Sequence, residues 1–184
     1  MSEEARLFVG VELPQAVRGE LARWTRHATS SHGGLRRVDV ANLHLTLCFL
    51  GQQPLVEINE LAVLLGGLAE SLAAVGELVL GAPVWLPPRR PRALAIEVGD
   101  PDGGLRALQS ALARELAASI DWRPGPQRFR PHVTVARLPP DRARAVPLEP
   151  TPALRFACER VVLWRSYLER EGARYEALAS VGGW

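Results

Sequence analysis

The chain has 184 residues, a length that suits one domain or two small lobes sharing a core, and we expect a single two-lobed domain over residues 1–184. With 47% hydrophobic and 23% charged residues it is typical of a soluble globular protein, and its formal net charge of +2 does not by itself predict nucleic-acid binding. No apolar run approaches the length needed to cross a membrane, and the N-terminus lacks the basic and apolar regions of a secretory signal, so we expect a cytoplasmic protein without a membrane partner.

The first half of the chain predicts three strands separated by two helices. Its strands are short apolar or alternating runs, and its helices repeat apolar residues every three or four positions. Paired glycines at 66 and 67 weaken the middle of the second helix. The expected elements are a strand at 6–13, a helix at 14–28, a strand at 42–51, a helix at 54–75 and a strand at 76–85.

We expect the second half to repeat the same order of elements. A Pro- and Arg-rich loop at 87–92 separates the halves and could form a basic lip for RNA, although a solvated loop explains it equally well. The expected elements are a strand at 93–98, a helix opening at Asp100–Pro101, a strand within 128–139, and strands at 154–168 and 173–181 joined by a hairpin turn at 169–172.

All 22 basic residues are arginine, a count that a compositional bias explains better than phosphate recognition does. Arg36–Arg37 could steer an anion, although an exposed charge pair is the commoner explanation. Cys48 and Cys158 lie in apolar runs without a CxxC or His-rich partner, which predicts small buried side chains in a reducing compartment. We expect His27 and His32 to face solvent without a catalytic role.

Two stretches share a pattern around which the rest of the chain is organised. NLHLTLCFLG and RFRPHVTVARLP each place threonine two positions after histidine, His44 with Thr46 and His132 with Thr134. Because side chains alternate faces along a strand, each pair points to one face of its strand. A core histidine bonded to a neighbouring strand explains one such pair. Two matched pairs, 88 residues apart, instead indicate similar halves that each deliver one strand to a shared cleft.

These two His-x-Thr strands, in this order and with these flanks, resemble the two-histidine phosphoesterases, in particular the RNA 2′,3′-cyclic phosphodiesterase or 2′-5′ RNA ligase family. The resemblance implies an α+β, bilobal fold with a pseudo-twofold relation, an antiparallel sheet with packed helices in each lobe, and the two motif strands facing a central cleft. It covers most of the chain, including the opening strand RLFVGVELP and the spacing of Leu163, Ser166, Gly172, Tyr175 and Leu178.

Two histidines suit the hydrolysis of a cyclic phosphate, because imidazole exists in neutral and protonated forms near neutral pH. One ring takes a proton from the attacking water and the other protonates the leaving ribose oxygen, and each transfer typically contributes about 10²–10⁴-fold. The resemblance suggests His44 as the acid and His132 as the base, although exchanging the roles would leave the pattern unchanged. The hydroxyls of Thr46 and Thr134 can donate to the phosphate oxygens, and Arg130 is a further candidate for binding the phosphate.

The resemblance also implies that Phe49 and Arg137, each five residues beyond a motif histidine, sandwich a nucleobase. An aromatic ring and a guanidinium plane are both good stacking surfaces for a base. Strict alternation would put these side chains on the face opposite their histidines, so we expect each strand to end or twist there, which Gly51 and Pro139 allow. The alternative is that Phe49 is a core residue and Arg137 a surface charge.

The activity implied by the resemblance is hydrolysis of 2′,3′-cyclic phosphates to 2′-phosphomonoesters, with weak reverse joining of RNA ends through a 2′-5′ linkage. Its substrates would be RNA with cyclic phosphate ends or nucleoside cyclic phosphates, and we expect a monomer that needs no cofactor. Only two histidines converge and no carboxylate lies in either motif, which disfavours a metal site. Two alternatives stay open: a phosphodiesterase for 2′,5′-linked oligonucleotides, and a module that binds RNA ends without catalysis.

Overall fold

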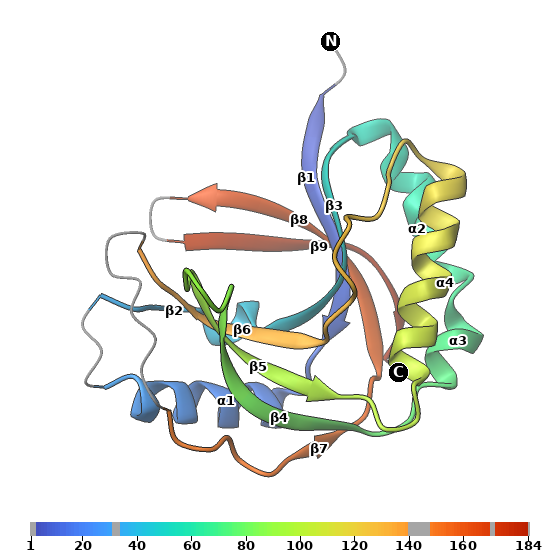
Figure 1. Cartoon of the computed structure of the whole chain (residues 1–184). Coiled ribbons are helices and arrows are strands. Elements are labelled where there is room, and N and C mark those ends of the chain that lie inside the picture. Colours follow the sequence, from blue (N-terminus) through green and yellow to red (C-terminus); the bar gives the residue numbers. More distant parts are fainter. Residues whose placement is uncertain (1–2, 31–33, 140–147, 170–171, 184) are drawn as a thin grey trace.

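The computed structural model describes residues 3–30, 34–139, 148–169 and 172–183, which form a nine-stranded sheet with helices packed against it (Figure 1). In chain order the elements are β1 (Glu4–Glu12), α1 (Gln15–Ala28), β2 (Arg36–Arg37), the 3-10 helix η1 (Val40–Asn42), β3 (His44–Pro54), the 3-10 helix η2 (Leu55–Glu57), α2 (Ile58–Gly66), α3 (Ala69–Ala73), β4 (Leu78–Leu86), β5 (Ala93–Gly99), α4 (Gly104–Ser119), β6 (His132–Arg137), β7 (Arg155–Phe156), β8 (Arg160–Glu169) and β9 (Gly172–Gly182).

The sheet is antiparallel at every pairing and consists of two halves that meet at the motif strands. The strand order is β7-β4-β5-β6-β3-β1-β8-β9, with β2 pairing separately with β6. Strands β3 and β6, which carry the two histidines, are neighbours through one residue pair, Leu45 with Val133. The expected α+β fold with an antiparallel half-sheet in each lobe is therefore confirmed, and the two half-sheets continue into one another.

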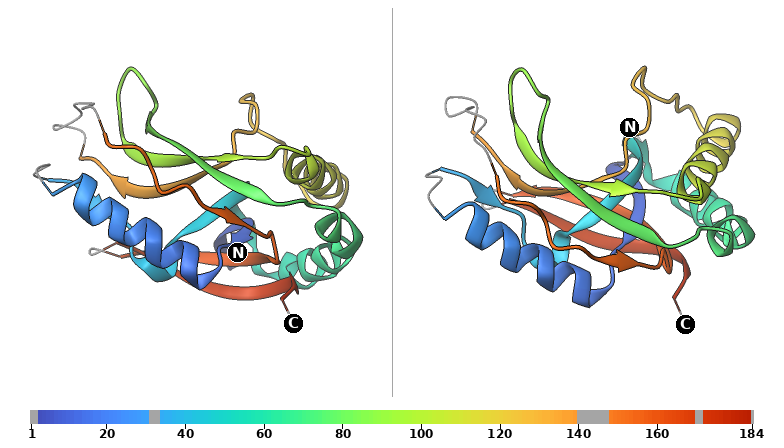
Figure 2. Two further views of the ribbon diagram at one scale, coloured as in Figure 1. Left: turned by 90° about the horizontal axis from the view of Figure 1, so that it is seen from below. Right: turned by 60° about the horizontal axis from the view of Figure 1, so that its bottom comes forward.

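The helices bury the apolar stripes that their sequences predict. Figures 1 and 2 show α2, α3 and α4 together at one end of the curved sheet and α1 alone at the other end. A fully buried leucine contributes about 1.5–3 kcal/mol relative to an exposed one, so these stripes fix the helices to the sheet. The buried residues are Val17, Leu21 and Trp24 in α1, and Leu105, Leu108, Leu112 and Leu116 in α4.

The structure corrects three expectations about the elements. The helix expected at 54–75 is broken into η2, α2 and α3, because glycine is a poor helix former and the chain turns at Gly66–Gly67. The strand expected at 154–168 is two strands, since β7 pairs with β4 and β8 pairs with β1, so the chain crosses the molecule between them. The described residues between β6 and β7 contain no helix, so the order of the first half is not repeated within the part of the second half that the structure describes.

The remaining expectations have simple outcomes. Cys48 and Cys158 are buried and free, and burial raises the pKa of their thiols to about 11 and about 12, so both stay protonated near neutral pH. His27 is exposed, as expected, whereas His32 and the turn residues 170–171 lie outside the described residues. The hairpin itself is confirmed by the pairing of β8 with β9. No helix in the described part of the chain is long and apolar enough to cross a membrane.

Candidate active site

The two motif strands carry the same irregularity at the same place. On β3 the pairing with β1 passes from Cys48 to Thr46 and leaves Leu47 without an opposite residue. On β6 the pairing with β5 passes from Ala136 to Thr134 and leaves Val135 unopposed. An extra residue of this kind is a β-bulge. Each bulge lies three residues after its histidine, so the two halves match in this detail.

The bulges decide which side chains share the site. An extra residue shifts the alternation by one, so the residue five positions after each histidine returns to the histidine's own face. The six residues from each histidine onward have the same burial pattern, in which Phe49 and Arg137 are exposed after two consecutive buried residues. Strand β3 does not end near Gly51, since it continues past Phe49 to Pro54, and its pairing with β1 is irregular on both sides of Phe49.

One cavity, with a volume of about 370 Å³, brings the predicted residues together. The antiparallel pairing of Leu45 with Val133 sets the backbone of His44 opposite that of Thr134 and the backbone of Thr46 opposite that of His132, so the two motifs lie next to each other. The cavity is called the catalytic cavity below, because the two predicted catalytic histidines line it. The sequence-predicted residues in its lining are His44, Thr46, Phe49, His132, Thr134 and Arg137.

Both histidines are oriented by the same backbone contact. Nδ1 of His44 lies 2.7 Å from the carbonyl oxygen of Asn42, and Nδ1 of His132 lies 2.7 Å from that of Arg130. A carbonyl oxygen only accepts, so Nδ1 carries the proton in each ring. In the neutral form Nε2 is then free to accept a proton. Nε2 of His44 lies 3.0 Å from Oγ1 of Thr46, which holds that nitrogen at the cavity side of β3.

His44 lies among aromatic rings that exclude water from it. Its ring centroid is 4.7 Å from that of Phe8, 5.2 Å from Tyr175 and 5.5 Å from Trp164. This burial lowers the pKa of His44 from its ordinary value. The hydrogen bond to Asn42 opposes the shift, and the positive charges of Arg137 and His132 add to it. His44 is therefore biased towards its neutral form while the cavity holds no anion.

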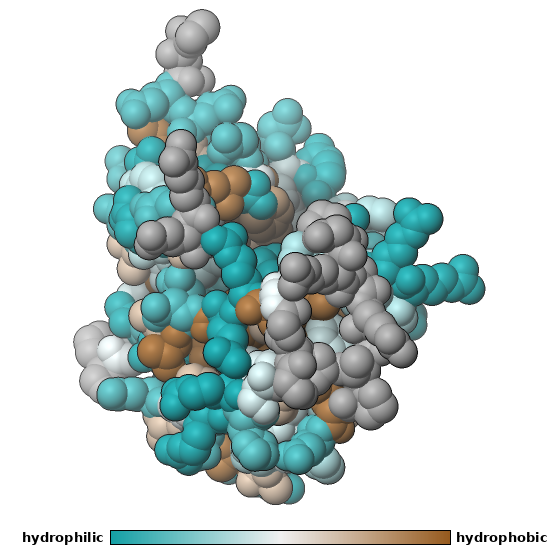
Figure 3. All heavy atoms as spheres, turned by 90° about the vertical axis from the view of Figure 1, so that its left-hand side faces the viewer, coloured by the Kyte–Doolittle hydropathy of each residue, from teal (hydrophilic) through white to brown (hydrophobic). Residues whose placement is uncertain are grey.

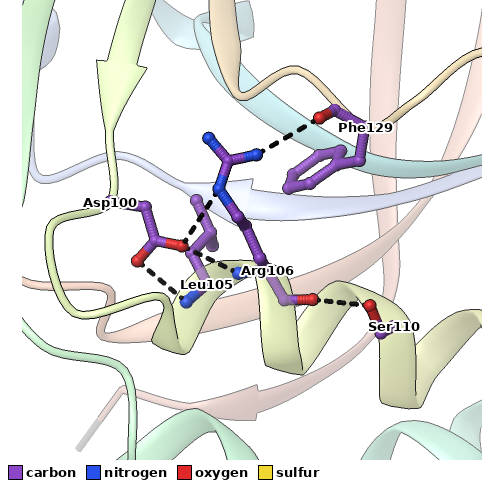
Figure 4. Close-up of polar contacts among 5 residues, drawn as sticks. All are labelled: Asp100, Leu105, Arg106, Ser110 and Phe129. Atoms are coloured by element: carbon purple, nitrogen blue, oxygen red, sulfur yellow. Dashed lines mark hydrogen bonds and ion pairs between the residues drawn. The ribbon is translucent and has the colours of Figure 1, made fainter.

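The segment that leads into His132 is hydrogen-bonded to a side chain of helix α4 (Figure 4). The Asp100 carboxylate, which is almost fully buried, accepts the backbone N–H groups of Leu105 and Arg106 at 3.1 and 2.9 Å and so caps the start of the helix. Arg106 lies 3.9 Å from that carboxylate and donates to the carbonyl oxygen of Phe129 at 3.4 Å. The backbone three residues before His132 is thereby tied to a rigid element.

Arg130 differs from the other predicted site residues, because its side chain does not line the catalytic cavity. Its guanidinium forms an ion pair with Glu97 on β5, at 2.5 Å. What Arg130 contributes to the site is its carbonyl oxygen, the partner of His132 Nδ1. Its binding to phosphate stays a prediction to which the geometry gives no support.

Several lining residues were missed by the sequence reasoning. Phe8 and Arg6 come from the face of β1 opposite to the predicted core face, and the alternation of that strand was the signal that could have found them. The Arg6 guanidinium lies over the ring of Phe49, 4.7 Å from its centroid. Phe49 is 49% exposed, which is unusual for its residue type and leaves ring surface open to the cavity.

The sequence is similar to those of known proteins over most of its length. The model of the 2′-5′ RNA ligase superfamily matches residues 13–170. The chain is 30% identical to an RNA 2′,3′-cyclic phosphodiesterase of Escherichia coli, over 97% of this chain and 96% of that one. It is 31% identical to an RNA 2′,3′-cyclic phosphodiesterase of Thermus thermophilus, over 94% and 87% of the two chains.

Solved structures give the same result for the fold. A crystal structure of a Thermus thermophilus protein superposes with a TM-score of 0.83 at 30% identity, covering 96% of this chain and 97% of that one. The crystal structure of Escherichia coli LigT complexed with 3′-AMP superposes with a TM-score of 0.79 at 28% identity, covering 98% of both chains.

Proposed function

The chain belongs to the 2′-5′ RNA ligase superfamily, and from that premise we propose that it hydrolyses RNA 2′,3′-cyclic phosphate ends to 2′-phosphomonoesters. The observation that carries the proposal is the pair of histidines in one cavity, each with Nδ1 bonded to a carbonyl oxygen two residues earlier. Each Nε2 is then available for proton transfer. The names of the relatives, which include RNA 2′,3′-cyclic phosphodiesterases from two bacteria, support the same activity.

The reaction needs two proton transfers and no covalent intermediate with the protein. Water attacks phosphorus as one histidine takes its proton, the bond from phosphorus to the 3′ oxygen breaks, and the second histidine protonates that oxygen. Each transfer typically contributes about 10²–10⁴-fold. We assign the base to His132 and the acid to His44, as the resemblance suggests.

The lowered pKa of His44 bears directly on the acid role. In the free enzyme the ring is biased towards its neutral form, which cannot donate from Nε2. The cyclic phosphate is an anion, and an anion beside His44 favours the imidazolium form. It also offsets the positive charge of Arg137 that disfavours it. Binding of the anion therefore raises the pKa of His44 back towards its ordinary value, which favours the protonated ring that an acid catalyst needs.

The other lining residues have roles that follow from their chemistry. The hydroxyls of Thr46 and Thr134 flank the two histidines and can donate to the non-bridging oxygens, where negative charge grows during the reaction. The ring of Phe49 and the guanidinium of Arg137 stack on the base. Joining RNA ends through a 2′-5′ linkage uses the same two proton transfers, with the 5′-hydroxyl of a second RNA end in place of water: one histidine takes the proton of that hydroxyl, the bond from phosphorus to the 3′ oxygen breaks, and the other histidine protonates the 3′ oxygen.

The test is to incubate the purified protein with nucleoside 2′,3′-cyclic phosphates in the presence of a chelator and to identify the product. We expect the 2′-phosphate and not the 3′-phosphate. A protein that binds these ends but releases no product would be an RNA-end-binding module. Faster cleavage of 2′,5′-linked oligonucleotides than of cyclic phosphates would identify the other enzymatic alternative.

A further inference from the structure

A second cavity opens directly from the catalytic one. Its volume is about 540 Å³, and its own lining includes β2, η1 and the start of β9. The residues that line both cavities are Arg36, Arg137, Glu169, Gly172, Ala173 and Tyr175. A site that holds one nucleotide therefore continues into a space large enough for further nucleotides, since ligand sites of about 300–1,000 Å³ are usual.

The walls of the second cavity are held together across the fold. The Asn42 amide, in η1, donates to the carbonyl oxygen of Ala173 in β9 at 2.6 Å. Arg174 lies 4.0 Å from the ring centroid of Tyr167 and donates to Glu169 at 2.9 Å. On the facing wall, Nε of Arg37 donates to Oγ1 of Thr29 at 3.1 Å. These contacts fix the positions of two guanidinium groups before any ligand arrives.

The charges of the second cavity favour an anion. Four arginines and two acidic residues line it, which leaves a net charge of +2. The Asp39 carboxylate accepts the backbone N–H of Ala41, and Glu169 is engaged by Arg174. At the junction of the two cavities, Arg36 and Arg137 are direct partners across β2 and β6.

The chemistry of the proposed substrate sets the direction in which a chain must leave the catalytic cavity. A 2′,3′-cyclic phosphate is a 3′ end, so the RNA continues only from the 5′ side of the terminal nucleoside. The side of the molecule where β2 lies and β8 ends is mostly hydrophilic outside its grey atoms, with hydrophobic residues among the hydrophilic ones (Figures 1 and 3). Proteins that bind single-stranded RNA commonly use a positively charged groove that runs along the backbone of the strand.

We propose that the second cavity binds the nucleotides preceding the cyclic phosphate, so that the preferred substrates are RNA oligonucleotides. This inference rests on the proposed function. Arg36 and Arg137 flank the phosphodiester on the 5′ side of the terminal nucleoside, and Arg37 and Arg174 bind the next part of the backbone. The guanidinium of Arg137 serves both contacts, because its plane stacks on the base while its edge donates to phosphate.

The experiment compares kcat/KM for a nucleoside 2′,3′-cyclic phosphate with that for a trinucleotide ending in the same group. The wild-type enzyme is expected to prefer the trinucleotide by about tenfold, the effect of one charge-assisted contact. The double variant Arg37→Ala, Arg174→Ala changes residues that line the second cavity and not the catalytic one, although Arg37 also lines a smaller cavity beside α1. It should lose most of this preference while turnover of the mononucleotide stays at the wild-type level, which also shows that the variant is folded.

Arg155→Ala is the matched control. Arg155 is exposed and paired with Glu77 at 3.2 Å, as Arg174 is with Glu169, but it lies on β7 and lines neither cavity. It should keep the preference for the trinucleotide. For the double variant, the plot of log(kcat/KM) for the trinucleotide against log salt concentration should be less steep by about 0.7 for each phosphate that the variant no longer binds.

Three results would overturn the inference while the proposed function stood: equal kcat/KM for the two substrates in the wild type, an equal loss on both substrates in the double variant, or the same loss of preference in Arg155→Ala. Absence of turnover of both substrates by the wild type would overturn the proposed function, and this inference with it.

Discussion

Gly10 lies in β1 where that strand passes the first histidine motif. It is paired with Thr46, next to the bulge at Leu47. A Cβ atom at this position would lie 2.5 Å from the carbonyl oxygen of Leu45 and 3.2 Å from Cα of Thr46. Both neighbours are backbone atoms of β3, so no side-chain rotation relieves the contact. Gly10→Ala therefore forces the two strands apart between His44 and Thr46.

The size of the effect follows from these distances. Ordinary van der Waals contact begins at 3.4 Å, so the carbonyl of Leu45 must move by about 0.9 Å. That displacement is passed directly to His44 and Thr46, which flank Leu45, and it changes their position relative to His132. A misplacement of about 1 Å lowers the rate by about 10²-fold, and overpacking of this kind costs about 1–3 kcal/mol of stability.

The assay measures kcat/KM for a nucleoside 2′,3′-cyclic phosphate on the folded fraction of Gly10→Ala, together with its free energy of unfolding. Gly19→Ala is the matched control, because a Cβ there meets nothing within 4 Å. The control should keep wild-type activity and gain about 0.5–1 kcal/mol of stability, since Gly19 lies within α1. Wild-type activity in folded Gly10→Ala would refute the claim that β1 sets the separation of the two histidines.

Further measurements test the individual site residues. His44→Ala and His132→Ala should each lower kcat by at least about 10²-fold with the fold retained, measured by turnover and circular dichroism, and Thr46→Ala should lower it less because it removes one of several donors. Phe49→Ala should raise KM for all four nucleoside cyclic phosphates more than it lowers kcat, because the lost stacking on the base is worth about 1–3 kcal/mol. An unchanged KM in both Phe49→Ala and Arg137→Ala would contradict the stacking of these side chains on the base. The pKa of His44 is lowered in the folded protein, so the unfolded chain binds more protons between that pKa and the ordinary value near 6.5. Acidification from about pH 7 to about pH 5 should therefore lower the free energy of unfolding of the wild type more than that of His44→Gln, as measured by denaturant unfolding. A difference that does not vary with pH would contradict the burial of His44. Activity should survive a chelator, because in the described residues no three His, Cys, Asp or Glu side chains converge on a metal site; loss with EDTA and recovery with a divalent ion would refute this.

The local pattern of the sequence was enough for most of the elements and for the central residues of the site. The apolar stripes of α1 and α4 are periodic over a few turns, and that period alone identifies them as helices packed on one face. The duplicated His-x-Thr pattern placed two histidines and two threonines in one cavity, because a spacing of two keeps side chains on one face of a strand.

Where the sequence reasoning failed, the deciding contact came from a distant part of the chain. The run at 154–168 is rich in apolar residues, and nothing in it shows that β7 pairs with β4 in one half-sheet while β8 pairs with β1 in the other. Arg130 lies beside His132 in sequence, but Glu97 on the neighbouring strand holds its side chain outside the catalytic cavity. Such partners are set by how the strands are ordered.

The sequence by itself determined that each half of the chain supplies one histidine and one threonine on one strand face, because that requires only the alternation of an extended backbone. Only the tertiary structure decided that Phe49 and Arg137 join them, because a bulge exists only where two strands are paired and one has a residue too many. The rings around His44 come from β1, β8 and β9, and the second cavity from β2, η1 and β9. Both are built from segments far apart in the sequence, so their geometry is fixed only when the strands pair.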